Sequence, residues 1–148
     1  MKLFVDTEFN GLGGYLISMA LVSEAGHEWY ETLPLPADVN PWVREHVVPL
    51  LNKAPIERPD FIDSLGRWLG RFADDIEIIG DWPADFEHLS DLMAHYGAQH
   101  DFTMPFEYRM RFIKGSPDIK PETPHNALSD ARALRDWYLA AHPMPAAA

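Results

Sequence analysis

The sequence contains no cysteine, which excludes disulfide bonds, thiolate metal sites and cysteine nucleophiles. It also lacks any apolar stretch as long as a transmembrane helix. An acidic residue occurs as early as Asp6, which does not fit the apolar core of a secretory signal peptide. We therefore expect a cytoplasmic protein.

Basic residues are scarce, with 12 lysines and arginines against 23 acidic residues and a formal net charge of −11. Proteins that coat nucleic acids need a broad basic surface, so this balance argues against that class. An enzyme that holds only the end of a strand needs far fewer basic side chains. Part of the acidic excess would also be explained if carboxylates bind metal ions.

The length of 148 residues and the 47% apolar content fit one folded domain. We expect a single domain over residues 1–141 and a disordered C-terminal tail over residues 142–148. Short apolar runs and glycine turns predict strands at 2–6, 15–23, 27–33 and 76–80. Helical spacing and proline starts predict helices at about 41–51, 60–72, from Pro83 onward, and at about 126–140, with 98–124 irregular. This order predicts an α/β fold, in which a central mixed sheet with three antiparallel first strands is flanked by helices.

A pair of acidic residues, Asp6 and Glu8, ends the first predicted strand. Residues two apart on a strand face the same side, so the two carboxylates point into one space. Like charges held this close repel unless a cation lies between them. A glycine turn at Gly11 follows, where a ligand can approach the backbone. A solvated polar strand end is the alternative interpretation.

Another acidic segment follows the predicted strand at 76–80. Asp85 is expected in the first turn of a helix, at the end of a buried strand where sites in α/β proteins collect. Asp81 is the competing candidate for a site residue. Either residue could instead cap the helix or complement its dipole.

A third cluster opens the last predicted helix with His125 and Asp130. If both residues were helical, they would lie about 140° apart around the axis. We therefore expect His125 in the preceding loop, where a histidine suits a general base near neutral pH. An incidental polar residue before a helix is the alternative.

Together the three clusters offer four carboxylates and one titratable base. Carboxylate oxygens favour Mg²⁺ or Mn²⁺ over zinc. Two such ions roughly 4 Å apart can activate a water and stabilise the leaving oxygen in phosphodiester hydrolysis.

These motifs resemble those of the DEDDh 3′→5′ exonucleases of the RNase H-like superfamily. The first family motif, Asp-x-Glu followed by a Gly-Leu turn, matches residues 6–12. The second, an Asp at the start of a helix, matches Asp85, and the third, His-x-x-x-x-Asp, matches His125 to Asp130. The usual Asn before the second motif is here Asp81. A closer resemblance, over about residues 3–138, is to the small mycobacterial-type 3′→5′ exoribonucleases, which also open with Asp-Thr-Glu-Phe.

The resemblance implies an RNase H-like fold and 3′→5′ trimming of single-stranded RNA or 3′ overhangs by a two-metal-ion mechanism. It implies two Mg²⁺ or Mn²⁺ ions per active site, held by Asp6, Glu8, Asp85 and Asp130, with His125 as the general base. It also suggests a homodimer. We expect the terminal nucleotide against the first turn, at Thr7, Phe9, Asn10, Gly11 and Leu12.

Two further segments offer side chains that could contact the substrate. Arg109 and Arg111 alternate in the most basic stretch and could bind substrate phosphates, with a solvated strand face as the simpler interpretation. Trp42, together with Arg44 and His46, could line the substrate path, although its position in a predicted helix favours packing in the core.

Three rival functions share these features. A DNA-preferring 3′→5′ exonuclease would carry the same motifs. An inactive RNase H-like module that binds nucleic acid or protein is expected to have lost acidic ligands, and all four are present. A two-metal phosphatase acting on small nucleotides is the third alternative.

Overall fold

The structure, a computed structural model, describes residues 1–72, 75–101, 103, 104 and 106–143. Its centre is a five-stranded sheet in the order β3-β2-β1-β4-β5. The strands are β1 (Lys2–Phe9), β2 (Leu16–Ser23), β3 (Glu28–Thr32), β4 (Ile76–Gly80) and β5 (Tyr108–Phe112). β1, β2 and β3 pair antiparallel, whereas β4 and β5 run parallel to β1. The predicted α/β class and the antiparallel start of the mixed sheet are confirmed.

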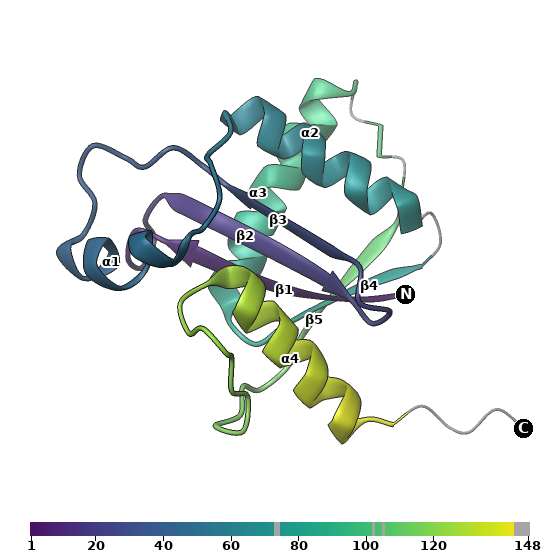
Figure 1. Ribbon diagram of the computed structural model, residues 1–148. Coiled ribbons are helices and arrows are strands. Elements are labelled where there is room, and N and C mark those ends of the chain that lie inside the picture. The colour runs from purple at the N-terminus through teal and green to yellow at the C-terminus, as the bar shows by residue number, and fades with distance from the viewer. Residues whose placement is uncertain (73–74, 102, 105, 144–148) are drawn as a thin grey trace, which may run out of the picture.

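Helices cover both faces of this sheet (Figure 1). α2 (Arg58–Leu69) and α3 (Pro83–Gln99) pack on one face, and α4 (Ala127–Ala141) crosses the other. The short α1 (Pro41–His46) lies at one end of the sheet. Two 3₁₀ turns, η1 (Val48–Leu50) and η2 (Gly70–Phe72), follow α1 and α2. None of the helices in these described ranges combines the length and the apolar content that a membrane crossing needs.

The alternation of side chains along β1 decides which face each residue serves. Leu3 and Val5 join the large core cluster with α2 and α3, whereas Phe4 packs with Leu134 and Tyr138 of α4. Because strand residues two apart share a face, the side chains of Asp6 and Glu8 continue the Phe4 row on the α4 side. The first strand therefore carries its acids toward the start of α4.

The expected order of elements was wrong in one respect, because residues 98–124 are not all irregular. Tyr108–Phe112 forms β5 at the edge of the sheet, where four of its five residues are exposed. The segment has no continuous apolar run, which hides an exposed edge strand, but the alternation around Arg109 and Arg111 is that of the solvated strand face that the sequence allowed.

The helix expected at about 41–51 was also too long. α1 ends at His46 and a 3₁₀ turn follows. Pro49 has no backbone N–H and disfavours helical geometry at the residue before it, which breaks the helix here. The predicted tail falls largely on residues 144–148, which lie outside the described part of the chain.

Candidate active site

Three carboxylates from two elements converge at the end of β1. Asp6 and Glu8 come from the strand, and Asp130 comes from the first turn of α4. One carboxylate oxygen of each lies within 4.8 Å of the other two. The small residues of α4 allow this approach, because Ala127 and Ala131 pack directly on Ala20 and Val22 of β2.

Asp85 is the most deeply buried of the predicted acidic residues, with 1% of its surface exposed. Its Oδ1 accepts hydrogen bonds from the Thr7 hydroxyl at 2.6 Å and from the Thr7 backbone N–H at 3.1 Å. Its Oδ2 is buried and has no hydrogen-bond partner among the described residues. Asp85 does not join the three-carboxylate group, but its charge is the strongest neighbouring charge acting on Asp6.

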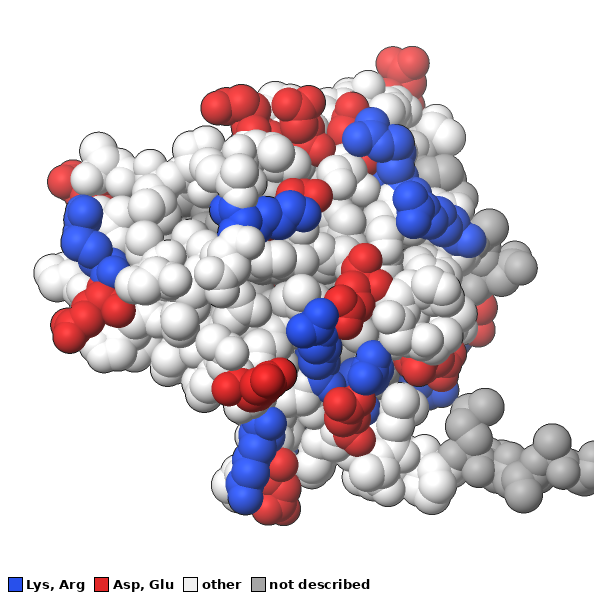
Figure 2. Space-filling view, in the orientation of Figure 1, with Lys and Arg blue, Asp and Glu red and all other residues white. Residues whose placement is uncertain are grey.

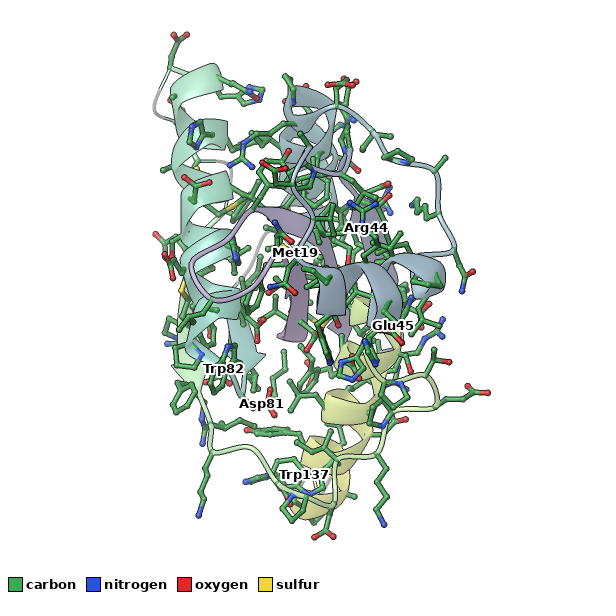
Figure 3. All side chains as sticks on the ribbon, turned by 90° about the vertical axis from the view of Figure 1, so that its left-hand side faces the viewer. Met19, Arg44, Glu45, Asp81, Trp82 and Trp137 are labelled. Atoms are coloured by element: carbon green, nitrogen blue, oxygen red, sulfur yellow. The ribbon has the colours of Figure 1, made fainter. Side chains whose placement is uncertain are left out.

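Asp81 is a fifth carboxylate at this end of the sheet. It follows β4 directly, and the pairing of Phe4 with Ile79 sets it level with Asp6. In Figure 3 its side chain lies between the start of α3 and α4. A β-carbon at Gly115 would approach its Oδ2 to 3.0 Å, so a glycine leaves room for this carboxylate. The sequence left open whether Asp81 or Asp85 belongs to the site, and the structure brings both to it.

The site is electrostatically strained when no cation is present. Burial, and then the charges of Asp85, Asp130, Glu8 and Asp81, raise the pKa of Asp6 well above its ordinary value. Burial, followed by the charge of Asp130, raises the pKa of Glu8 to about 8. Burial is also the main reason why the pKa of Asp85 is raised to about 7 and that of Asp130 to about 6. Carboxyls with raised pKa values hold their protons to a higher pH than free carboxyls do, unless a cation takes the place of the proton.

The donor set fits a hard divalent cation. The carboxylate oxygens of Asp6, Glu8 and Asp130 converge, and outside that group the buried Asp85 Oδ2 lacks a partner that a cation would supply. Oxygen ligands of this kind suit Mg²⁺ or Mn²⁺.

His125 lies beside these carboxylates in the loop before α4, as expected. Its φ of 67° is in the left-handed region, which non-glycine residues adopt at a cost. Its backbone N–H donates to Asp130 Oδ2 at 3.0 Å. Its ring meets the Trp42 ring edge to face, with centroids 5.0 Å apart and planes at 86°.

A pocket of about 360 Å³ opens next to Glu8. Its walls come from the turn after β1 and from α1, and are formed by Glu8, Phe9, Gly11, Asn40, Trp42, Val43 and Val47. Trp42 is 49% exposed, so the prediction that it packs in the core was wrong. α1 is too short to bury every apolar residue, and Val43 and Val47 take the core side instead.

The residues of the first turn have separate roles in the structure. Phe9 and Gly11 line the pocket, and the Phe9 ring lies 5.2 Å from that of His88. Leu12 is 88% exposed. The Asn10 side chain instead donates to the Asp38 carbonyl at 2.8 Å and accepts from the Asn40 N–H at 2.7 Å, which ties the turn to α1.

The two arginines of β5 lie apart from the carboxylates and are paired with acids. Arg109 contacts Asp75 at 2.8 Å, and Arg111 lies 3.7 Å from Glu77. The Arg111 guanidinium is also 5.9 Å from the Tyr138 ring centre. Both arginines lie before the C-terminal end of β5, whereas the acidic site lies at the C-terminal ends of the neighbouring parallel strands.

Two residues, Thr7 and Asn126, support the site through contacts that the sequence analysis does not predict. Thr7 was expected to touch substrate but is 6% exposed and holds Asp85. Asn126 caps α4 by accepting from the Ser129 N–H at 3.0 Å and donates to the Leu50 carbonyl at 2.7 Å. An asparagine just before a helix signals the cap, but no sequence pattern predicts the bond to Leu50.

No family model matches the sequence, and no curated protein matches it either.

Proposed function

We propose that this protein is a metal-dependent 3′→5′ exonuclease with an RNase H-like fold that trims single-stranded RNA or 3′ overhangs. The observation that carries the proposal is the convergence of Asp6, Glu8 and Asp130 within 4.8 Å, beside the buried Asp85 with its unpartnered oxygen. The mixed five-stranded sheet, with its antiparallel strands first and its acids at the end of β1, supports the fold.

The cation ligands in this proposal are Asp6, Glu8, Asp85 and Asp130. Asp85 stands apart from the other three, which favours two Mg²⁺ or Mn²⁺ ions over one. When bound, such ions lower the pKa of water and neutralise charge on the phosphate and the leaving oxygen. The protein contributes by holding the carboxylates in place, Asp85 through Thr7 and Asp130 through the His125 backbone.

His125 is the general base. Its ring accepts the proton of the water that attacks the terminal phosphorus. The bond from phosphorus to the 3′ oxygen of the preceding nucleotide breaks, and that oxygen leaves with the bonding electrons and takes up a proton from solvent. The exposed position of His125 beside the carboxylates leaves its ring free to meet that water.

The terminal nucleotide fits the pocket beside Glu8, whose volume of about 360 Å³ lies in the range of small-ligand sites. On the face in Figure 2, the described acidic and basic side chains are interspersed and form no continuous basic surface. A protein that contacts only the 3′ end of the nucleic acid needs no broad basic surface, which agrees with that distribution and with the net charge of −11.

The test is degradation of a 5′-labelled single-stranded RNA, beside a DNA of the same sequence, with Mg²⁺, Mn²⁺ or EDTA. We expect a cation-dependent ladder that shortens from the 3′ end and is faster on RNA. Asp6→Asn and Asp130→Asn should abolish it, and Asp91→Asn on the exposed side of α3 should not. A faster DNA ladder would identify a DNA-preferring exonuclease.

Absence of cleavage with either polymer and either cation would contradict the proposal. Cleavage of dinucleotides alone would then favour a small-nucleotide hydrolase. Binding without any cleavage would favour an inactive nucleic-acid-binding module.

A further inference from the structure

The ring of His125 is less constrained than its backbone. The backbone is fixed by the left-handed φ of 67° and by the bond from its N–H to Asp130. Within the described ranges, its imidazole makes no hydrogen bond, and the aromatic ring beside it is that of Trp42, 5.0 Å away. The Trp42 ring therefore limits the rotation of the imidazole on that side.

Trp42 is itself held firmly although it is exposed. Its backbone N–H donates to Asn40 Oδ1 at 2.9 Å, and its ring stacks on that of His46, with centroids 4.6 Å apart and planes 9° apart. The His46 Nδ1 lies 2.9 Å from the Trp42 carbonyl oxygen, which fixes the stacking partner in turn.

A hydrogen bond joins the segments that carry Trp42 and His125: the Asn126 side chain, at the start of α4, donates to the Leu50 carbonyl just beyond α1. Asn10 separately ties the turn after β1 to Asn40 at the start of α1. The ring-to-ring contact therefore joins two parts of the chain that are already tied together.

Trp42 also lines the pocket beside Glu8. One indole thus touches both the space offered to the terminal nucleotide and the ring of His125. We propose that Trp42 is a positioning residue for His125, so that the orientation of the imidazole depends on the Trp42 ring and on what occupies the pocket. This inference rests on the proposed function.

The test is a double-mutant cycle of Trp42→Ala and His125→Ala, measured as kcat and KM on the labelled RNA. Trp42→Ala alone should lower kcat about ten- to a hundredfold, because a small displacement of a catalytic group costs that much. In the His125→Ala background, adding Trp42→Ala should leave kcat unchanged, because the imidazole that Trp42 positions is already absent. KM should rise by a similar factor in both backgrounds, since the pocket contact is lost in both.

Trp42→Phe keeps an aromatic ring beside His125 and should recover most of the lost kcat. Phe112→Ala removes an exposed aromatic residue of β5 and serves as the matched control, with both constants unchanged. Mn²⁺ affinity should be the same in Trp42→Ala and the wild type, which separates positioning of the base from damage to the carboxylate site.

Equal losses of kcat from Trp42→Ala with and without His125 would overturn the role of Trp42 while leaving the exonuclease intact. A wild type that cleaves neither RNA nor DNA would overturn the proposed function and the kinetic role together. A histidine-labelled NMR spectrum tests the contact without activity: the His125 Hε1 resonance should move in Trp42→Ala, and an unmoved resonance would contradict it.

Discussion

Among single residues, Asp85 shows how a buried carboxyl depends on a distant partner. Thr7 supplies both hydrogen bonds to its Oδ1 from 78 residues away. We predict that Thr7→Val lowers the free energy of unfolding by about 1–3 kcal/mol, because the buried Oδ1 loses its hydroxyl donor. Urea denaturation of the metal-free protein measures this loss.

Thr32→Val is the matched control, because Thr32 is also buried, at 1% exposed against 6% for Thr7, and its hydroxyl makes only a 3.3 Å bond to the Lys53 carbonyl. The loss in Thr7→Val should exceed that in Thr32→Val. Equal losses in the free energy of unfolding would mean that the Thr7 hydrogen bond to Asp85 does not stabilise the fold more than the weak Thr32 bond does.

Local spacing explains which site residues the sequence could predict. Asp6 and Glu8 follow from the two-residue period of a strand, and His125 with Asp130 follows from the start of a helix. The bond between Thr7 and Asp85 joins distant segments, so no local pattern signals it. Asp81 and Asp85 could not be separated because both belong to the site region.

At the scale of elements, the position of Asp130 depends on how closely α4 approaches the sheet. Ala131 is fully buried against Ala20 and Val22. We predict that Ala131→Leu lowers the free energy of unfolding by about 1–3 kcal/mol, because the larger side chain overpacks this contact. It should also weaken Mn²⁺ binding by moving Asp130 away from β1.

Ala140→Leu places the same side chain on the exposed end of α4 and should change neither stability nor binding. Thermal unfolding and Mn²⁺ titration of the two variants provide the comparison. An Ala131→Leu protein with wild-type affinity for Mn²⁺ would show that Asp130 does not depend on this packing.

The elements that the sequence misjudged are those with little buried surface. β5 has one half-buried and four exposed residues, and α1 has a single buried residue, Val43. Apolar periodicity reports burial, so it predicted the central strands and the long helices and failed at the edge strand and the short helix.

For the whole molecule, the crowded carboxyls predict how stability depends on pH. The pKa values of Glu8, Asp85 and Asp130 are raised to about 8, 7 and 6 in the folded protein. Between about pH 4 and pH 8 the folded state therefore binds more protons than the unfolded state, so stability falls as pH rises. Urea denaturation in EDTA should give a lower free energy of unfolding at pH 8 than at pH 5.

Mg²⁺ or Mn²⁺ should remove most of this difference, because a bound cation replaces the protons. Asp81→Asn should also reduce it in EDTA, since Asp81 raises the pKa values of Asp6, Asp85 and Asp130. Stability that is the same at pH 5 and pH 8 in EDTA would contradict the strained state of the site.

In the proposed function, the carboxylates at the end of β1 hold divalent cations. Calorimetric titration of Mn²⁺ into the wild type, Asp6→Asn and Asp91→Asn tests this binding. We predict saturable binding to the wild type, at least about tenfold weaker binding to Asp6→Asn, and no change in Asp91→Asn. Identical isotherms for the wild type and Asp6→Asn, or no binding to either, would contradict the claim.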